Sequence, residues 1–404
     1  MLLSQQTEAV KLHKVVLNGI AGSLVLIFKE NRYSDKVLEK LFKQNKQWGS
    51  RDRRFVAESV YDIVRYYKLL SHLAQSTNNF WFITAVYLVL KGIDLPDWPE
   101  FKHVNKELIL QEYENVKTNF NLFQSYSDSM VEVCEKELGK DIWQREAEAM
   151  NKTAEVVLRV NTLKTNLKTL KEKLLKDGME TEEIASVENA LILKKRANVF
   201  SNINFKEGLF EIQDCGSQQI GLFAGVEPKQ FVIDACAGAG GKSLHLAALM
   251  QNKGRVLSLD IGQWKLDELI KRAKRAGVHN VETKLIENAQ TISQLKEKAD
   301  VVLLDVPCSG IGVLKRNPDT KWKFNTEVFE KTKQLQQQIL SDYSVMVKSG
   351  GHMVYSTCSI LPSENKEQVN SFLEKNSSFD FVEEKTIFPS EGFDGFYMCK
   401  LRKK

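Results

Sequence analysis

The sequence predicts an α/β protein in which a doubly wound, mostly parallel sheet forms the larger part. An all-helical domain precedes this sheet, and a small α/β element joins the two. Short apolar runs alternate with helix-like segments from residue 231 onward, whereas residues 1–145 hold helix formers with apolar side chains at helical spacing. With 404 residues, the chain is long enough for at least two domains.

The N-terminal domain is expected to be helical over residues 1–145. Its clearest apolar stripe consists of Phe55, Val56, Val60, Ile63 and Val64. Near residue 150 the pattern changes to a strand at 156–160, a helix at 167–176 and a strand at 190–193. We therefore expect the small α/β element over residues 150–215.

The larger α/β domain is expected over residues 216–404. Strands are predicted at 231–236, 255–260, 281–286, 300–305 and 352–357, and helices at 241–251, 263–276, 326–348 and 364–374. Gly277 and the pair Gly350 and Gly351 are expected at helix ends, where left-handed backbone favours glycine. Ser363 is expected to cap the last helix.

The charge permits a nucleic-acid partner without requiring one. The net charge is +5, which a solvated basic surface explains equally well. Basic clusters lie at 194–196, at 271–275 and at 315–323, and the last cluster is a candidate for contacts with RNA phosphates. Within it, Trp322 is expected to pack in a core rather than to stack on a base.

The cysteines and the apolar segments indicate in which compartment the protein is expected. The six cysteines have no close-paired spacing, so neither a zinc site nor a disulfide framework is expected. The longest apolar run, residues 80–90, is too short to span a bilayer, and the N-terminus lacks a signal-like pattern. We expect a cytoplasmic protein that binds neither a metal nor a membrane.

A glycine-rich turn follows the first strand of the larger domain. It consists of Cys236, Ala237, Gly238, Ala239, Gly240, Gly241 and Lys242. Small residues let the backbone approach a ligand, and the next helix offers free amide donors. Cys236 stands where a Walker loop needs glycine, which argues against an NTPase. Asp260 closes the next strand, where a carboxylate can bind ribose hydroxyls, so NAD and S-adenosylmethionine fit equally.

Two cysteines lie just beyond the ends of predicted strands. Cys308 stands in the stretch Asp-Val-Pro-Cys that begins at Asp305, and Cys358 stands in Ser-Thr-Cys-Ser. A lone cysteine after an apolar run is usually a packing residue. Two thiols delivered to one sheet edge beside a cofactor loop instead favour chemistry, because ligands collect at that edge.

Hydride transfer needs no nucleophilic thiol, whereas methylation of a pyrimidine carbon does. A thiolate that adds to carbon 6 of cytosine makes carbon 5 able to accept a methyl group, after which loss of the carbon 5 proton and elimination release the enzyme. A second thiol can assist this release. Asp305 is a candidate to hold the amino edge of the base.

Five motifs together resemble the RsmB/Nop/Sun family of RNA 5-methylcytosine methyltransferases, which use S-adenosylmethionine. They are the loop 236–242, Asp-x-Pro-Cys at 305–308, Ser-Thr-Cys-Ser at 356–359, Arg-Val-Asn-Thr at 159–162 and Asp-Gly-Phe-Tyr at 394–397. The resemblance implies a class I, Rossmann-like methyltransferase domain over 216–404. It makes Cys358 the nucleophile and Cys308 the residue that promotes product release.

The same resemblance implies the cofactor contacts. Residues 236–242 would face the methionine end, Asp260 the ribose and Asn288 the adenine, with Asp305 at the floor of the active site. Two positions depart from the family pattern. Ala239 replaces the usual proline and keeps the turn small, and Asn288 replaces the usual aspartate, so that it keeps hydrogen bonding but loses the charge.

The stretch 316–322 resembles the bacterial ribosomal-RNA branch, and residues 35–72 resemble a NusB-type helical domain. These likenesses imply an enzyme acting on ribosomal RNA or a ribosomal subunit precursor, with transfer RNA as the alternative substrate. We expect a monomer. RNA contacts are expected from the 150–215 element and, to a limited extent, from Arg51, Arg53 and Arg54.

Two other functions stay open on the residues alone. A nicotinamide-dependent oxidoreductase explains the glycine-rich turn and Asp260 but leaves both thiols without a role. A non-catalytic RNA-binding factor explains the basic clusters but has no use for the cofactor loop.

Overall fold

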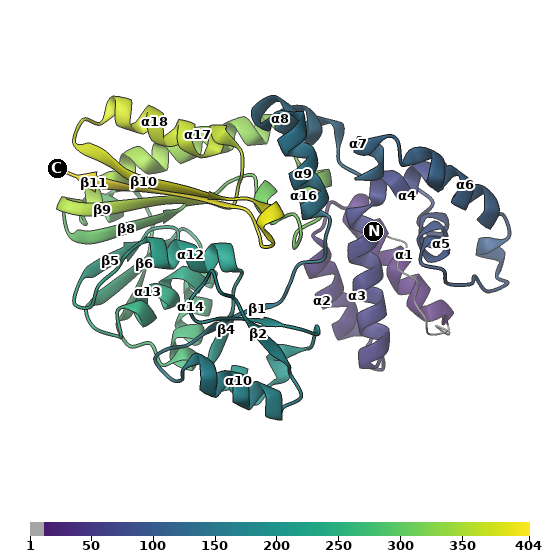
Figure 1. The fold of residues 1–404 in the computed structure, drawn as a ribbon, viewed down its shortest axis with the longest axis horizontal. Helices are drawn as coiled ribbons and strands as arrows, with labels where there is room; N and C mark the ends of the chain where they lie inside the picture. The colour runs from purple at the N-terminus through teal and green to yellow at the C-terminus, as the bar shows by residue number, and fades with distance from the viewer. Residues whose placement is uncertain (1–11) are drawn as a thin grey trace. The chain divides into compact units, whose positions relative to one another are not determined.

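The computed structural model describes residues 12–404 (Figure 1), which divide into two compact units. The first, the helical unit, contains residues up to 152 together with 314–326. The second, the sheet unit, contains residues 153–313 and 327–404. A short stretch that follows the first cysteine motif in the chain therefore belongs to the helical unit.

The helical unit confirms the expected all-helical N-terminal region. Its helices are α1 (Lys14–Phe28), α2 (Ser34–Gln44), α3 (Ser50–Arg65), α4 (Tyr67–Leu73), α5 (Phe80–Leu90), α6 (Lys106–Val116), α7 (Phe120–Phe123), α8 (Asp128–Leu138), α9 (Lys140–Met150) and α16 (Thr320–Lys323), with a 3₁₀ turn at Pro99–Phe101. Asn79, Asn105 and Asn119 cap α5, α6 and α7, because each side chain accepts a hydrogen bond from a first-turn amide.

The predicted apolar stripe of α3 faces the core of this unit. Val56, Val60, Ile63 and Val64 are fully buried, and Phe55 packs against them from the edge. Helix α5 is the most apolar, but it has only 11 residues. Among residues 12–404 we find no helix whose length and hydropathy would let it cross a membrane.

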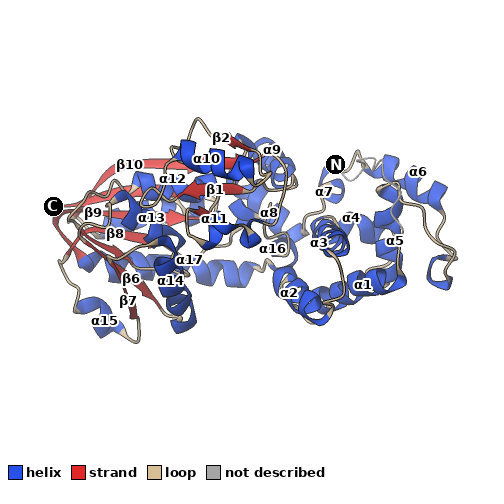
Figure 2. Cartoon of the chain, turned by 90° about the horizontal axis from the view of Figure 1, so that it is seen from below, coloured by secondary structure: helices blue, strands red, loops and turns tan. Residues whose placement is uncertain are grey.

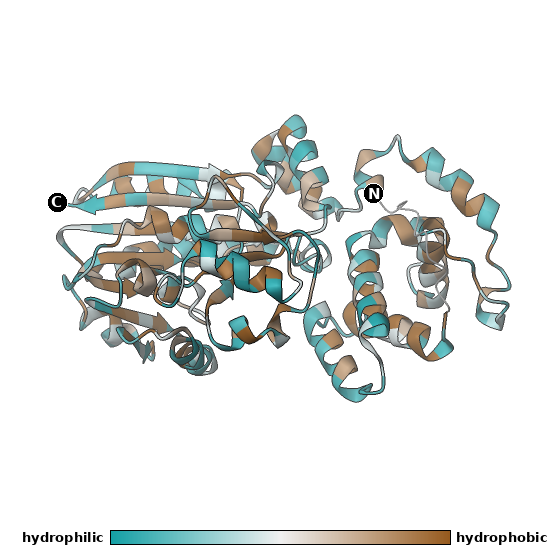
Figure 3. Ribbon diagram, turned by 60° about the horizontal axis from the view of Figure 1, so that its bottom comes forward, coloured by the Kyte–Doolittle hydropathy of each residue, from teal (hydrophilic) through white to brown (hydrophobic). Residues whose placement is uncertain are grey.

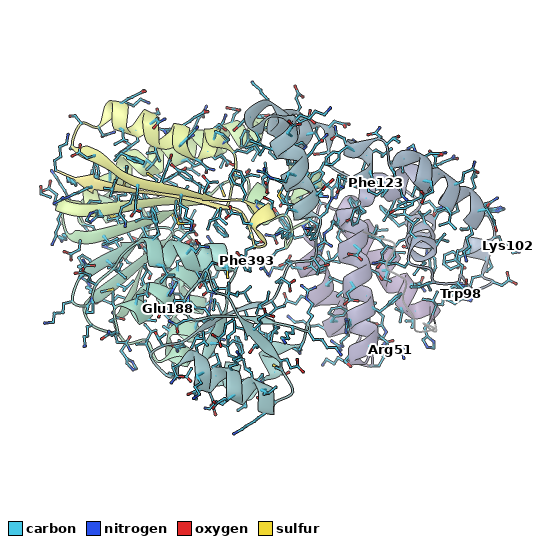
Figure 4. The ribbon with its side chains drawn as sticks, viewed as in Figure 1. Arg51, Trp98, Lys102, Phe123, Glu188 and Phe393 are labelled. Carbon is cyan, nitrogen blue, oxygen red and sulfur yellow. The ribbon has the colours of Figure 1, made fainter. Side chains whose placement is uncertain are left out.

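The arginines expected to contact RNA have different surroundings. Arg53 donates hydrogen bonds to the carbonyls of Trp48 and Asn45, and Arg54 forms an ion pair with Glu58. Arg51 projects from the start of α3 (Figure 4). Arg53 therefore has a structural role in closing the α2–α3 turn.

Residues 314–326 bury a lysine among the helices. Lys321 is 0% exposed, and its ammonium lies within 3.2 Å of the carbonyls of Arg65, Gln124 and Ser125 and 2.6 Å from Asn151 Oδ1. The indole of Trp322 donates to the Val64 carbonyl over 2.6 Å. The expectation that this basic segment contacts phosphate is wrong for Lys321, because its buried amino group donates to backbone carbonyls instead. Trp322 packs as expected.

The sheet unit confirms the doubly wound fold (Figures 1 and 2). The seven strands have the order β10-β11-β9-β8-β5-β6-β7. They are β5 (Phe231–Asp234), β6 (Arg255–Asp260), β7 (Val281–Leu285), β8 (Ala299–Asp305), β9 (Val347–Thr357), β10 (Phe379–Ile387) and β11 (Phe396–Lys403). Strands β5 to β9 pair in parallel, and β10 and β11 add an antiparallel edge.

Helices cover both faces of this sheet. One face packs on α12 (Cys215–Phe223), α13 (Gly241–Leu249) and α14 (Gln263–Ala276), and the other on α15 (Ala289–Ser293), α17 (Thr326–Tyr343) and α18 (Lys366–Lys375). Within β8, Val301 and Leu303 point to the first face, whereas Val302 and Leu304 point to the second. The strands are therefore apolar on both sides, and Figure 3 colours the inner strands mostly brown.

Two predicted boundaries are wrong. Helix α17 ends at Tyr343, and β9 already begins at Val347, so that Gly350 and Gly351 lie inside a strand rather than at a helix end. The pairing of β8 with β9 skips residues 348–351, which bulge there, and a Cβ on Gly351 would lie 2.8 Å from the Asp300 carbonyl. Ser363 does not cap α18, which begins after Asn365. Gly277 ends α14 in left-handed backbone, as predicted.

A four-stranded antiparallel sheet forms the small element of the sheet unit. Its order is β2-β3-β1-β4, from β1 (Val157–Val160), β2 (Thr181–Glu183), β3 (Ala190–Leu193) and β4 (Phe210–Ile212), with helices α10 (Leu167–Lys176) and α11 (Ile203–Lys206). Phe393, labelled in Figure 4, packs on an apolar cluster that includes Val157 and Cys215. The β10–β11 connection thus contacts the small element.

We expect Lys321→Met to lower the free energy of unfolding by about 3 kcal/mol, because several buried carbonyls lose their donor at about 1–3 kcal/mol each. Urea unfolding followed by circular dichroism measures this loss. Lys40→Met, at an exposed lysine of α2, is the matched control and should change stability by less than about 0.5 kcal/mol. Equal stability of the two variants would contradict the structural role of Lys321.

Candidate active site

The glycine-rich turn and Asp260 form one hydrogen-bonded unit. The Asp260 carboxylate accepts from the amides of Gly238 and Gly262 over 2.9 and 2.8 Å and lies 3.1 Å from the Lys265 ammonium. Gly238 and Gly240 both have left-handed backbone, with φ of 53° and 85°. A Cβ on Gly240 would lie 2.4 Å from Leu269, so only glycine lets α13 start so close to α14.

This turn fits the expected cofactor. A Cβ added to Gly238 would meet no atom within 4 Å, so the backbone there borders open space that a ligand could fill. Asp260 stands at the carboxyl end of β6, where it can accept from a ribose. The residues at 236–241 together with Asp260 therefore offer the small backbone and the acceptor that S-adenosylmethionine requires.

Three other predicted cofactor residues are held by their local surroundings. Burial raises the pKa of the Cys236 thiol well above its ordinary value, which keeps it neutral. Asn288 is exposed, and its side-chain oxygen accepts from the Gln290 amide at the start of α15. The carbonyl of Ala239 accepts a hydrogen bond from Arg272 over 2.7 Å.

Lys242 and Asp305 form an ion pair beside the turn. The ammonium and the carboxylate lie 2.6 Å apart, and Ser356 Oγ donates to the other carboxylate oxygen over 3.2 Å. Burial acts to lower the pKa of Lys242, but the charge and the hydrogen bond of Asp305, together with smaller contributions from its neighbours, outweigh burial, and the net shift is upward. Lys242 therefore stays charged and orients Asp305, whose side chain is 27% exposed.

The two predicted cysteines lie together. The sulfur atoms of Cys308 and Cys358 are 3.1 Å apart, at the ends of the neighbouring strands β8 and β9. The hydrogen bond to Cys358, together with burial, raises the pKa of Cys308 well above its ordinary value. The Cys308 thiol is therefore held in its neutral form beside Cys358.

Glu364 shapes the loop that carries Cys308 and has no counterpart among the predicted residues. It is 0% exposed, and its carboxylate accepts from the Ser309 amide over 2.7 Å, from Ser309 Oγ and from Gln336 over 3.1 Å. These contacts come from α17 and from the Cys308 loop. No spacing in the sequence indicates them, because the partners are far apart in the chain.

The loop of Cys358 is held by its backbone. The Gly312 amide donates to the Cys358 carbonyl over 3.0 Å, and a Cβ on Gly312 would lie 2.9 Å from that carbonyl oxygen and 2.2 Å from the Gly395 carbonyl oxygen. Thr357 Oγ1 donates to Asn365 Oδ1 over 2.6 Å, and Asn365 donates in turn to the Ser359 carbonyl over 3.0 Å. These contacts hold both thiols in one geometry.

Asp234, at the end of β5, is a second buried carboxyl group that was not predicted. It is 0% exposed, and its Oδ2 accepts from Ser243 Oγ over 2.6 Å. Burial raises its pKa to about 6. The only sequence signal is its position directly before the glycine-rich turn.

Two arginines connect the turn to the small element. Arg272 of α14 donates to the Ala239 carbonyl and also contacts Glu211, 3.0 Å away. Arg159 of β1 donates to the Gly241 carbonyl over 2.7 Å and also to Gln213, and burial lowers its pKa to about 10. The cofactor loop is therefore held by residues tied to β1 and β4.

We expect Arg272→Gln to weaken S-adenosylmethionine binding about tenfold, because a charge-assisted hydrogen bond to the loop is worth about 1.5–3 kcal/mol. Isothermal titration calorimetry measures the dissociation constant. Lys271→Gln, one residue away on the exposed side of α14, is the control and should bind as the wild type does. An unchanged constant for Arg272→Gln would show that the loop holds its shape without this arginine.

The raised pKa of Asp234 predicts that the stability of the folded protein depends on pH. Its folded-state pKa of about 6 exceeds the ordinary 3.8, so the contribution of this group to stability is fully present below about pH 4 and is lost as the pH rises through 6. As the pH rises between those limits, the free energy of unfolding of Asp234→Asn should therefore increase by about 2–3 kcal/mol relative to that of the wild type.

Urea unfolding at a series of pH values measures this difference. Asp267→Asn, at an exposed carboxylate of α14, is the control, and its difference from the wild type should not vary with pH. A pH-independent difference for Asp234→Asn as well would mean that Asp234 is ionised in the folded protein throughout.

The chain matches known protein families over two segments, 126–200 and 223–402. The family described as 16S rRNA methyltransferase RsmB/F matches residues 223–402, and its ferredoxin-like domain matches residues 126–200. A probable ribosomal RNA small subunit methyltransferase B from Synechocystis is 27% identical over 93% of this chain and 97% of its own length. The one from Bacillus subtilis is 32% identical over 61% of this chain, a match that spans 59% of that relative.

Solved structures agree with these relatives. The crystal structure of PH0851 has a TM-score of 0.82 over 98% of this chain and 100% of its own; at 23% identity it shows the shared fold. A methyltransferase homologue from Pyrococcus horikoshii, 26% identical, has a TM-score of 0.63 over 71% of this chain and 98% of its own. These matches exclude the oxidoreductase and the non-catalytic factor. Residues 223–402 therefore form an S-adenosylmethionine-dependent RNA methyltransferase domain of the RsmB/F type.

Proposed function

We propose that this enzyme methylates carbon 5 of a cytosine in small-subunit ribosomal RNA through a covalent adduct with Cys358. The observation that carries the proposal is the pair of sulfur atoms, 3.1 Å apart, at the strand ends beside Asp305. The RNA class rests on the relatives, which are named ribosomal RNA small subunit methyltransferase B. Transfer RNA remains the alternative substrate for the same chemistry.

The residues divide the reaction between them. The Cys358 thiolate adds to carbon 6 of the cytosine, and the displaced electron pair makes carbon 5 nucleophilic. When bound, S-adenosylmethionine supplies the methyl group to that carbon. Solvent water then takes the carbon 5 proton, the electron pair of that C–H bond restores the double bond between carbons 5 and 6, and Cys358 leaves carbon 6 as a thiolate.

Cys308 assists the first step of this reaction, the attack on carbon 6, and the last step, the elimination. Its sulfur lies 3.1 Å from that of Cys358, so its S–H group can donate to Cys358 before attack. During elimination the same S–H group stabilises the departing sulfur, so a chain without it should be slow to release the RNA. Asp305, oriented by Lys242 and Ser356, accepts from the amino group of the base.

The cofactor contacts follow the same geometry. The backbone at 236–241 borders the methionine end, Asp260 accepts from the ribose hydroxyls, and the exposed Asn288 lies on the adenine side. Asn288 offers a hydrogen bond without a negative charge.

We expect Cys358→Ala to abolish methyl transfer and Cys308→Ala to accumulate a covalent RNA–protein adduct, because the first loses the nucleophile and the second loses assistance at release. The assay incubates each protein with methyl-labelled S-adenosylmethionine and with RNA or immature small subunits from a strain that lacks the gene. A denaturing gel detects the adduct, and nucleoside analysis detects 5-methylcytidine.

Cys399→Ala, at a buried cysteine of β11 remote from the two motifs in sequence, is the matched control and should behave as the wild type does. An adduct with Cys358→Ala in place of Cys308→Ala would reverse the two roles. Wild-type protein that binds S-adenosylmethionine but labels neither the RNA nor the subunits would overturn the proposed reaction.

A further inference from the structure

A basic depression lies where the small element meets the end of α14. Its volume is about 770 Å³. We call it the basic basin. It is lined by Lys164, Lys206, Glu207, Leu209, Lys271, Lys274 and Arg275. Five of these seven side chains are cationic and one is acidic, and none of them belongs to the site described above.

Two of these cations hold the walls of the basin together. Lys164 donates to the carbonyls of Glu207 and Arg275, both over 2.7 Å, and so ties the small element to α14. Arg275 pairs with Glu211 and lies 4.1 Å from the Phe205 ring. Their positions are set by folding, which gives the basin a fixed shape.

The remaining cations are free to bind a ligand. Lys206 and Lys274 are exposed and come from opposite walls, and across residues 12–404 neither has a side-chain hydrogen bond or an ion pair. Lys271 has only a distant carboxylate, that of Glu268 at 3.7 Å. Unpaired ammonium groups that converge on one depression attract an anion.

The helix end does not oppose this attraction. A helix C-terminus carries a partial negative charge on its free carbonyls, which would repel an anion. Here Lys164 donates to the Arg275 carbonyl, Asn161 to that of Ala276 over 2.7 Å, and Asn252 to that of Gly277 over 2.9 Å. These donors neutralise the carbonyls that would face the basin.

The form of the basin favours a polyanion over a single phosphate. It is broad and open, and its free cations are lysines, which act as flexible point charges rather than as the rigid forks that clamp one phosphate. Helix α14 runs for 14 residues, roughly 20 Å, from the cofactor edge near Asp260 to the basin. A ligand that occupies both the active site and the basin must therefore be extended.

An exposed aromatic side chain lies along the same helix. Trp264, in the first turn of α14, is 71% exposed. Lys271 follows seven residues later and so lies on the same face of the helix. Exposed aromatic rings combined with lysines are typical of surfaces that bind single-stranded RNA.

We propose that the basic basin binds the phosphodiester backbone of the substrate RNA, away from the target cytosine, with Lys206 and Lys274 as the phosphate contacts. The inference rests on the proposed function in that the RNA is taken to be the methylation substrate. It adds a second RNA contact, built jointly by the small element and the methyltransferase sheet.

The test is the double variant Lys206→Glu/Lys274→Glu. Fluorescence anisotropy measures binding of transcribed small-subunit ribosomal RNA between about 50 and 200 mM KCl. We expect the dissociation constant to rise about tenfold and the slope of its logarithm against log salt to fall by about 2, or one for each lost phosphate contact. Binding of S-adenosylmethionine, measured by calorimetry, should not change.

Lys296→Glu/Lys375→Glu is the control. It makes the same charge change at two exposed lysines, one just before β8 and the other at the end of α18. An equal fall of RNA affinity and salt slope in both double variants would overturn the proposal, because only net charge would then matter. Unchanged affinity and salt slope in the basin variant would overturn it as well.

The wild-type methylation assay separates this inference from the proposed function. Wild-type protein that labels cytosine while the basin variant keeps its full RNA affinity would overturn the basin alone. Wild-type protein that binds this RNA but never methylates it would instead overturn the proposed reaction.

Discussion

The candidate active site depends on the parallel register of β8 and β9. In this register Leu303 lies opposite Val354, and Asp305 lies opposite Ser356. Both strands are buried on both faces, so a slip of one residue would turn apolar side chains away from their cores. Core packing therefore fixes the register, and the register brings the two cysteine loops to one edge. The 3.1 Å between the sulfur atoms follows from the hydrophobic core as much as from the loops themselves.

Polar contacts then refine what the core has positioned. Glu364 binds the Cys308 loop, Gly312 binds the backbone of Cys358, and the ion pair of Lys242 orients Asp305. Each of these groups is buried or half-buried, where a hydrogen bond is strong and an unmet one is costly. The site is consequently organised before any substrate enters, which is the condition for electrostatic preorganisation.

The small element acts on the cofactor loop as well as extending the surface. Arg159 and Arg272 donate to loop carbonyls, and Gln213 and Glu211 bind these arginines from the end of β4. The basic basin lies between the same two parts. RNA that occupied the basin would therefore contact the elements that shape the cofactor site. In the helical unit, Lys321 shows the opposite use of a basic residue, because its buried amino group donates to backbone carbonyls and not to a ligand.

The sequence by itself determined the fold class, the glycine-rich turn, Asp260 and the two cysteine motifs, because each depends on a local pattern of apolar runs, small residues and strand ends. Tertiary structure decided the remainder. The roles of Glu364, Asp234 and Arg272 depend on partners that are distant in the chain, and the burial of Lys321 depends on how 314–326 joins the helical unit. The bulge at Gly350 and Gly351 likewise depends on pairing with β8. Local spacing cannot report such contacts, since they exist only once the chain has brought separate elements together.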